Sequence, residues 1–220
     1  MRRSKVESIY ERLLDEAQEL LEGEGFIREV DSFRQFSNGL KRGLQFQRSQ
    51  YETKNTISFT LNLGISSERL TSLLSESQKT PVWNSHVVKR IGFLLPDKLD
   101  KWWIISADTQ LLLLSTELKG VISLCALPFL RQFPDDIALR HYLKNLRADG
   151  EASYDEAFYI CLLDILVGST GELESSIQAF RRIACSTGFS HCETETKIAE
   201  IHAKLKAYRP VARVGDKQQG

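Results

Sequence analysis

The stretch TISFTLNLGI, residues 56–65, decides the fold class of this 220-residue chain. Large apolar residues occupy every second position, and the positions between them are small or polar. Because successive side chains of a β-strand point to opposite faces, this alternation predicts a strand with one buried face and one polar face. Such one-sided burial is typical of antiparallel sheets. The predicted buried set is Ile57, Phe59, Leu61, Leu63 and Ile65.

Two further segments predict strands on either side of this one. Residues 25–36 (GFIREVDSFRQF) are rich in aromatic and β-branched residues and end at the turn sequence Ser37-Asn38-Gly39, so we expect one strand there. Residues 86–95 (HVVKRIGFLL) predict another strand, which Pro96 stops because proline cannot donate a hydrogen bond to a ladder.

Residues 40–50 (LKRGLQFQRSQ) alternate as well, with Leu44 and Phe46 on the core face. The opposite face then presents uncharged hydrogen-bonding groups, edged by basic residues. This face is either an ordinary solvent-facing side, which antiparallel sheets often have and which we favour, or a protein-binding surface. The candidate protein-binding residues on it are Arg34, Gln45, Gln47 and Asn62.

The rest of the pattern is helical. Residues 4–21 carry an apolar stripe with a 3.6-residue period, and Ser4 with Glu7 has the spacing of a capping box. Asp108 is expected to cap a later helix, which Pro128 follows. A Gly-rich joint, GSTG at 168–171, implies an antiparallel helix pair. The helices expected in the second half of the chain span residues 108–124, 135–146, 154–167, 173–184 and 193–208.

One helix, then strands, then only helices is the element order of an α+β fold. We therefore predict an antiparallel sheet of about four strands packed on helices, followed by an all-helical C-terminal half. Residues 1–133 would form the α+β domain. Residues 134–208 would form a helical region, packed on that domain or separate from it as a small second domain, and residues 209–220 a disordered tail.

Composition excludes several classes of protein. Lys+Arg and Asp+Glu both number 29, so the chain lacks the basic excess of a dedicated polyanion binder. Its start is charged where a signal peptide has an apolar core, and its longest apolar runs, such as Leu111–Leu114, are too short to cross a bilayer. The four cysteines include no C-x-x-C pair. We expect a cytoplasmic protein with no membrane partner.

No catalytic motif is present: the chain has no G-x-S-x-G, Walker loop, G-x-G-x-x-G or H-E-x-x-H sequence. Potential metal ligands gather only around His191 and Cys192, with Cys185, Glu193 and Glu195 nearby, at a spacing that fits no usual zinc site. We therefore predict a protein that is not an enzyme and that holds no metal or cofactor. An enzyme remains the alternative, because catalytic triads assemble from distant residues.

The order of six short motifs resembles a widespread bacterial family known only as a domain of unknown function, number four-three-zero-four in that series. The resemblance covers residues 5–133 and implies a fold but no activity. Two features depart from the family, an insert at residues 66–85 and the helical region after Phe133. The motifs, in order, are Gly25-Phe26, Phe33-Arg34, Phe46-Gln47, FTLNLGI, RIGFLLP and DKWW.

The adjacent tryptophans, Trp102 and Trp103, point to opposite sides if they lie in a strand or turn. One indole is then expected to fill the core between sheet and helix, and the other to lie at the surface. The outward indole is a candidate interface anchor, because tryptophan is enriched in binding hot spots. Trp103 is included in the candidate protein-binding set.

Charge is distributed unevenly, and acidic residues outnumber basic ones in the C-terminal half. These acids could meet a basic partner, with steering that speeds association. We expect a non-catalytic protein-binding module, specifically an immunity-type antidote that binds and neutralises a bacterial toxin, possible partners being basic toxin domains. The neutral overall charge counts against it, as antidotes to nucleases tend to be acidic. The acidic residues assigned to this surface are Asp149, Glu151, Asp155, Glu156, Glu172 and Glu174.

The alternative is an enzyme or RNA-binding module that acts on nucleotides or RNA. Sheet-based RNA binders expose aromatic side chains on which bases stack. Phe46 and Phe59 instead fall on the predicted core face. Nucleic acid is therefore not the expected partner.

Overall fold

The computed structural model describes residues 4–53, 55–74 and 81–208. The chain divides into two compact units, Met1–Asp135 and Asp136–Gly220. The first contains an antiparallel sheet with helices, and the described part of the second contains helices only. The predicted α+β class with an all-helical C-terminal half is confirmed. The tail predicted at 209–220 lies outside the described residues.

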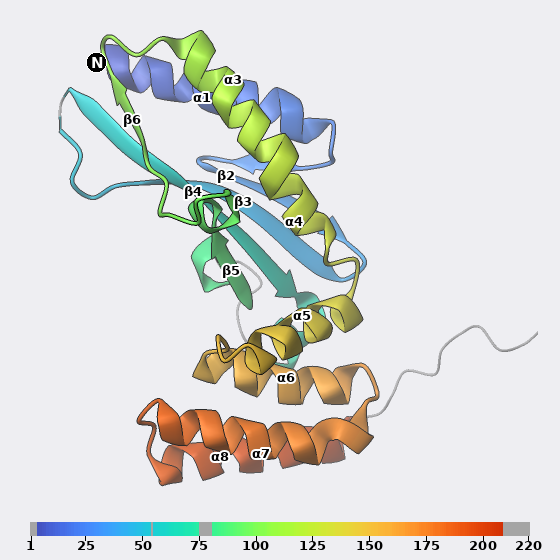
Figure 1. Ribbon diagram of the computed structural model, residues 1–220. Helices are drawn as coiled ribbons and strands as arrows, with labels where there is room; N and C mark the ends of the chain where they lie inside the picture. The colour runs from blue at the N-terminus through green and yellow to red at the C-terminus, as the bar shows by residue number, and fades with distance from the viewer. Residues whose placement is uncertain (1–3, 54, 75–80, 209–220) are drawn as a thin grey trace, which may run out of the picture. The chain divides into compact units, whose positions relative to one another are not determined.

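The first unit is built on a six-stranded antiparallel sheet (Figure 1). Five strands lie side by side in chain order: β1 (Ile27–Glu29), β2 (Ser32–Ser37), β3 (Leu40–Arg48), β4 (Thr56–Ser67) and β5 (Val87–Arg90). β6 (Trp103–Ser106) pairs with the first part of β4, whereas β5 pairs with a later part. The stretch TISFTLNLGI is therefore the central strand, with partners along both of its edges.

Two of the predicted strands differ from the structure. Residues 25–36 form the hairpin of β1 and β2, because Val30 turns the chain with a φ of 56°. Valine seldom adopts that conformation, so the sequence carries no turn signal there. The strand predicted at 86–95 ends at Arg90, and Ile91–Leu94 form the 3-10 turn η2.

The buried face of the sheet is covered by two helices that lie side by side (Figure 1). α1 (Lys5–Glu22) begins at the Ser4 cap as predicted, and Ser4 Oγ accepts a hydrogen bond from the Glu7 backbone N–H. The Ser115 hydroxyl of the second helix donates to the Glu16 carboxylate of α1. That second helix runs through α3 (Leu111–Val121), the π-helical turn η3 (Ile122–Ala126) and α4 (Leu127–Arg131).

Two predicted limits of this second helix were wrong. The helix begins after Gln110, so Asp108 is not its N-cap. Pro128 lies inside the helix, in the first turn of α4, rather than after its end. The π-helical turn before it shifts the backbone hydrogen-bond register, and a proline is tolerated in a first turn because its missing N–H is not required there.

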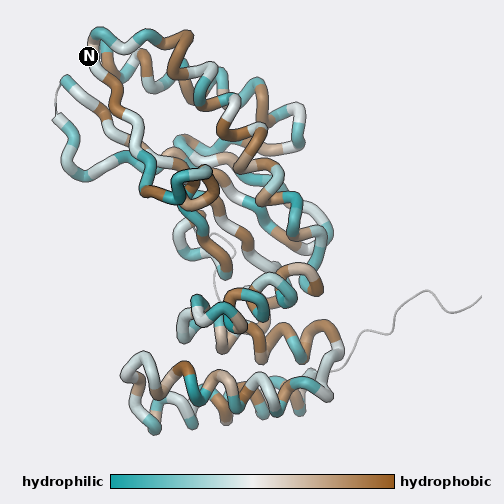
Figure 2. Tube along the Cα trace, in the orientation of Figure 1, coloured by the Kyte–Doolittle hydropathy of each residue, from teal (hydrophilic) through white to brown (hydrophobic). Residues whose placement is uncertain are grey.

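The core lies between these helices and one face of the sheet. The predicted buried set of β4 is confirmed, since each of its five apolar side chains is at most 2% exposed. Phe59 is central to this core. The centroid of its ring lies 5.7 Å from the ring centroid of Tyr10, 5.7 Å from that of Phe46 and 5.6 Å from that of Trp103. Figure 2 shows hydrophobic residues along the strands and on the helices above them.

Four helices make up the described part of the second unit: α5 (Asp136–Ala148), α6 (Tyr154–Leu166), α7 (Thr170–Ser186) and α8 (His191–Ala207). Capping boxes at Ser153 and Ser190 start α6 and α8. Asp164 of α6 is fully buried, and its Oδ1 lies 2.5 Å from Arg140 Nε and 3.2 Å from Lys144 Nζ. This unit therefore encloses an ion-pair network as well as apolar side chains.

Candidate functional site

One cross-strand row of side chains on the polar face of the sheet contributes Gln45, Asn62 and Arg90 to the lining of a cleft. Ser32 is paired with Gln45, Gln45 with Asn62, and Asn62 with Arg90. Residues directly opposite each other in antiparallel strands share a face. Each of β2, β3, β4 and β5 therefore contributes one side chain to this row.

The neighbouring row contains two adjacent glycines, and a turn packs onto them. Gly43 and Gly64 are paired across β3 and β4. A Cβ atom at Gly43 would lie 2.7 Å from Val82 Cγ2, and one at Gly64 would lie 2.7 Å from the Val82 carbonyl oxygen. The glycines thus let the 3-10 turn η1 (Val82–Asn84) approach the sheet closely. Trp83 follows Val82, and its side chain lies in the same cleft as the amide side chains of Gln45 and Asn62.

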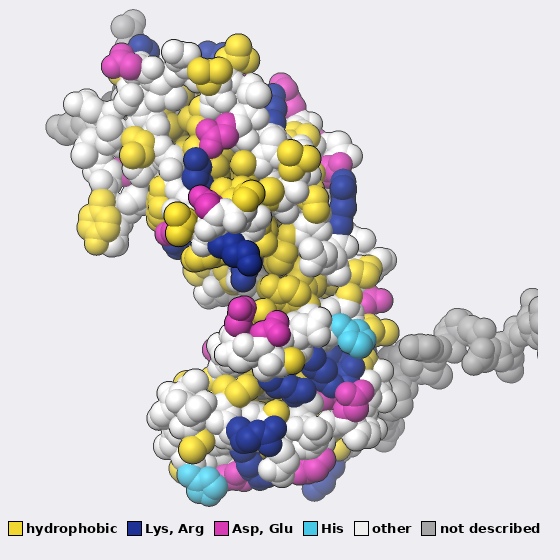
Figure 3. Space-filling model, viewed as in Figure 1, with side chains coloured by type: hydrophobic (Ala, Val, Ile, Leu, Met, Phe, Trp, Pro, Cys, Tyr) yellow, Lys and Arg dark blue, Asp and Glu magenta, His cyan; other side chains and the backbone are white. Residues whose placement is uncertain are grey.

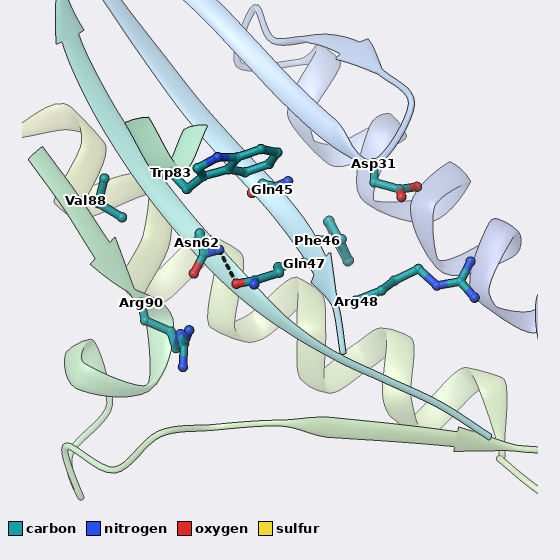
Figure 4. A pocket seen from close by; sticks show the side chains of 9 residues that line it. All are labelled: Asp31, Gln45, Phe46, Gln47, Arg48, Asn62, Trp83, Val88 and Arg90. Carbon is teal, nitrogen blue, oxygen red and sulfur yellow. Dashed lines mark hydrogen bonds between the residues drawn. The ribbon is translucent and has the colours of Figure 1, made fainter. Parts of the chain in front are cut away.

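The resulting cleft has a volume of about 700 Å³. Small-ligand pockets have volumes of roughly 300–1,000 Å³, so the cleft is of suitable size. Figure 4 shows Trp83 beside Gln45, with Asp31 and Arg90 toward different ends. Trp83 is 55% exposed. The lining residues are Asp31, Gln45, Phe46, Gln47, Arg48, Asn62, Trp83, Val88 and Arg90.

Two oxygen acceptors of the cleft have no partner within the described part of the chain. Gln45 is 9% exposed, and its buried Oε1 accepts no hydrogen bond. The Asp31 carboxylate makes no hydrogen bond or ion pair with the described residues, and burial raises its pKa. In contrast, Asn62 Nδ2 donates to Gln47 Oε1 at 2.7 Å. Since buried polar groups are nearly always hydrogen-bonded, Gln45 Oε1 marks where a ligand could bind, and the partly exposed Asp31 carboxylate offers a charge in the same cleft.

Both arginines of the cleft already have anionic partners. Arg48 Nη2 lies 2.9 Å from Glu7 Oε1 and 2.6 Å from Glu52 Oε2, and the hydrogen bonds to Glu52 and Glu7 raise the pKa of Arg48. Arg90 Nη1 lies 2.7 Å from Asp100 Oδ2. The cleft therefore offers unpaired acceptors, whereas its cations are paired.

The residues predicted for the polar face separate into two groups. Gln45, Gln47 and Asn62 come together in the cleft. Arg34 lies outside its lining, and Arg34 Nη1 is 2.5 Å from Glu29 Oε2. The favoured expectation of an ordinary solvent-facing side is wrong for this part of the sheet, because η1 covers the glycine row and Asn62 is only 4% exposed.

Trp103 is the inward indole of the tryptophan pair, so its assignment to a binding surface was wrong. It is 4% exposed and stacked on Phe59. Its Nε1 donates to Glu117 Oε1 at 2.9 Å. Trp102 points the other way and is half-buried, with the Arg90 guanidinium over its ring. The predicted alternation of the two indoles is confirmed.

The six acidic residues predicted for a partner surface all lie in the second unit, and three have structural roles. Glu156 completes the capping box of α6. Glu174 accepts a hydrogen bond from Gln178. Hydrogen bonds from Lys144 and Arg140 lower the pKa of Glu172 to about 2. The other three, which have no ion pair within the described residues, are exposed and lie close together in sequence: Asp149, Glu151 and Asp155.

Sequence reasoning missed the residues that turn the polar face into a cleft. Trp83 comes from the insert, and Asp31 from the turn of an unpredicted hairpin. One signal was available: glycines in two neighbouring strands, Gly43 and Gly64, indicate close approach of another segment. The pairing of those glycines requires the strand register, which the sequence alone does not determine.

A second surface feature is the apolar side of the α3–η3–α4 helix. Leu112, Leu113 and Leu124 are 77%, 64% and 78% exposed, and Figure 3 shows hydrophobic side chains at the surface of the first unit. Residues Leu111–Arg131 form one helix that is long and apolar enough to cross a membrane by length and composition. The expectation that no segment could cross a bilayer considered only uninterrupted apolar runs, and the helix predicted here ended at residue 124, before Pro128.

The cluster around His191 and Cys192 does not form a metal site. Glu193 accepts a hydrogen bond from the Ser190 hydroxyl at 2.6 Å, and Glu195 pairs with Arg181 at 2.9 Å. Across residues 4–53, 55–74 and 81–208, no group of three or more His, Cys, Asp or Glu side chains is placed to hold a metal ion.

Comparison with known proteins identifies a family without a known activity. No curated protein matches the chain, and no solved structure does. A family described as "Domain of unknown function (DUF4304)" matches residues 17–132, which is more than half of the chain and falls within the first unit. The resemblance inferred from the six motifs is thereby confirmed, and the chain belongs to the DUF4304 family.

Proposed function

We propose that this protein is a non-catalytic binding module that holds a partner protein in the cleft on the polar face of its sheet. The observation that carries the proposal is the pair of unpartnered acceptors, Gln45 Oε1 and the Asp31 carboxylate, beside the exposed Trp83. A buried acceptor gains a hydrogen bond only when a donor enters, and a half-exposed indole is a common anchor of protein interfaces.

The composition of the cleft favours binding over catalysis. Its lining holds no Ser, Thr, Cys, Lys or His side chain, and Asp31 is its one carboxylate. A nucleophile with an adjacent base, or a pair of acid and base groups, is the usual arrangement for acyl transfer and hydrolysis. The lining described here provides amide groups that hydrogen-bond and orient a partner.

The finer proposal is that the partner is a basic toxin domain that this protein neutralises in the bacterial cytoplasm. The exposed acids Asp149, Glu151 and Asp155 of the second unit would steer such a partner toward the protein. Steering between opposite charges speeds association and is screened by salt.

The test is purification of the tagged protein from its native host, together with the product of the neighbouring gene. We expect a 1:1 complex that weakens as salt rises, and we expect Trp83→Ala to weaken it while Tyr51→Ala, at an exposed aromatic outside the cleft lining, does not. A complex that both variants retain at full strength would contradict binding in the cleft.

A second candidate function is binding of a nucleotide or RNA, and the observation that favours it is Trp83 itself. The insert places the exposed ring of Trp83 on the polar face of the sheet, beside Gln45, where a base could stack. Copurification of RNA in place of a protein, lost in Trp83→Ala, would support this alternative.

A further inference from the structure

We propose that the cleft is a receptor for one arginine side chain of the partner protein, with the guanidinium group stacked on Trp83 and hydrogen-bonded to Gln45 Oε1, and with the Asp31 carboxylate as a counter-charge toward one end of the cleft. This inference rests on the proposed function and specifies the chemistry of the partner. It follows from which groups of the cleft lack partners and from the charge around them.

The buried side-chain atom of the cleft lining that lacks a hydrogen bond is an acceptor. Gln45 Oε1 is buried without a hydrogen bond, and the partly exposed Asp31 carboxylate has no hydrogen bond or ion pair within the described residues. Gln47 Oε1 already accepts a hydrogen bond from Asn62 Nδ2. An occupant that satisfies the cleft must therefore be a donor, and an anionic or acceptor-only group would leave both oxygens unsatisfied.

The charge around the cleft favours a cationic donor. Arg48 is shared by Glu7 and Glu52, and Arg90 is paired with Asp100. With Asp31 included, carboxylates outnumber guanidinium groups four to two in this cluster.

Other charges near Asp31 do not change this balance. Arg28 is paired with both Glu11 and Asp15, at 3.2 and 2.6 Å. The surroundings of Asp31 therefore hold no cation without a carboxylate partner within the described residues. An incoming cation would meet a negative field, and Asp31 would supply the carboxylate that it pairs with.

The geometry selects arginine over lysine. Gln45 Oε1 is buried beside the Trp83 ring, so a side chain that reaches it must slide against the indole. A guanidinium group is planar, stacks on aromatic faces and carries five donors in a fixed fork. An ammonium group is a strongly hydrated point charge that loses more by entering a partly dry site. The volume of about 700 Å³ also leaves room for the chain on either side of the arginine.

The experiment is a titration of the full-length, ¹⁵N-labelled protein with the capped tripeptide acetyl-Gly-Arg-Gly-amide, followed by NMR. We expect saturable shifts of the Trp83 indole N–H and of the side-chain amides of Gln45, Gln47 and Asn62. The same peptide with citrulline in place of arginine has nearly the same shape without the charge. We expect the citrulline peptide to bind at least about tenfold more weakly than the arginine peptide, because hydrogen bonds to charged groups are stronger than those between neutral groups.

Two variants locate the binding in the cleft. Trp83→Ala should weaken the arginine peptide by roughly 2- to 30-fold through loss of stacking, and Asp31→Asn by about tenfold. The matched controls, Tyr51→Ala and Asp97→Asn, alter exposed residues outside the lining and should leave affinity unchanged. The dispersion of each variant's spectrum verifies that it is folded.

The outcomes separate this inference from the proposed function. Equal binding of the citrulline peptide, or no binding of the arginine peptide, overturns the arginine receptor. Shifts of the same amides with adenosine but not with the arginine peptide overturn it as well, in favour of a nucleobase. If the protein complex is nevertheless lost in Trp83→Ala, the proposed function stands and this inference falls. If the arginine peptide binds in the cleft but no protein partner copurifies, arginine recognition stands and the proposed function falls.

Discussion

Both units of this protein bury polar groups, but they do so in opposite ways. In the second unit, Asp164 is fully buried and its Oδ1 contacts both Arg140 and Lys144. In the first unit, Gln45 Oε1 and the Asp31 carboxylate have no partner in the described part of the chain. A buried charge with its counter-charges belongs to the fold, whereas the acceptors that open onto the cleft without partners are the ones that we propose for recognition. A counter-charge in direct contact, more than burial, distinguishes Asp164 from Asp31, although Asp164 Oδ2 itself accepts no hydrogen bond from the described residues.

Replacing Asp164 with asparagine should produce the largest effect. Asp164→Asn keeps the shape but leaves Arg140 and Lys144, 5% and 15% exposed, with the exposed Glu172 as counter-charge in place of the buried one. Breaking a buried pair in this way costs about 3–5 kcal/mol. All three tryptophans lie in the first unit, so their fluorescence reports that unit alone. We expect the urea midpoint of far-UV circular dichroism to fall more than that of fluorescence.

The matched control for this change is Asp149→Asn, which removes the same charge from an exposed loop position of the same unit. It should alter stability by less than about 0.5 kcal/mol. If Asp164→Asn were as stable as this control, the ion-pair network would not be structural and the contrast between the units would fail.

His86 tests the comparison within the first unit, because it is buried and its Nδ1 accepts a hydrogen bond, which requires that nitrogen to be unprotonated. Ser67 N–H donates to His86 Nδ1 at 3.0 Å, and burial, with a smaller effect of Lys41, lowers the pKa of His86 to about 4. The unfolded chain takes up this proton near pH 6.5, so the stabilisation is fully present above pH 6.5 and is lost as the pH falls toward 4. That difference in pKa corresponds to roughly 3 kcal/mol.

The measurement is the free energy of unfolding from tryptophan fluorescence at pH 7.5 and pH 4.5. In His86→Asn, the amide oxygen can accept the Ser67 hydrogen bond but does not titrate. The variant should therefore lose less stability between these two pH values than the wild type. Equal losses in the two proteins would assign the pH dependence to other groups.

The contrast between fold and site also appears in what the sequence predicts. Strict alternation at Ile57, Phe59 and Leu61 identified the central strand and its buried face, because burial of one face imposes a period of two. The cleft depends instead on Val30, an unfavourable residue for a turn, and on Val82 packing against a pair of glycines. These features follow from tertiary contacts and strand register, which local sequence patterns do not encode.

Gly64→Ala should have an intermediate effect and would show how the cleft is built. A Cβ atom there would lie 2.5 Å from Ser85 Oγ and 2.7 Å from the Val82 carbonyl oxygen, so η1 must move. Overpacking of this kind costs about 1–3 kcal/mol. We also expect a change in tryptophan emission and loss of arginine-peptide binding, as Trp83 moves with η1.

Gly120→Ala provides a control of opposite sign. A Cβ atom at Gly120 meets nothing within 4 Å, and Gly120 lies inside α3. Alanine is favoured over glycine in a helix by about 0.5–1 kcal/mol, so this variant should be more stable than the wild type and should keep the cleft intact. If both alanine variants behaved alike, the close packing of η1 would not hold Trp83 in place.

Asp31→Asn should produce the smallest effect on stability, and its sign is the sharpest test of the comparison. Burial raises the pKa of Asp31, so the folded state binds its proton more tightly than the unfolded chain does. The ionised carboxylate therefore destabilises the fold at neutral pH, and this penalty disappears as the pH falls below its folded pKa. Because the group is partly exposed and screened by solvent, the gain in stability on replacing it should not exceed about 1 kcal/mol.

Neutralising a structural acid, such as Asp164, must lower the stability of the protein. Neutralising an acid kept for a ligand must instead raise the stability and lower the affinity for the ligand. Urea unfolding at pH 7.5, followed by tryptophan fluorescence alongside the arginine-peptide titration, distinguishes the two: a variant that is less stable than the wild type would place Asp31 among the structural residues and remove it from the binding cleft.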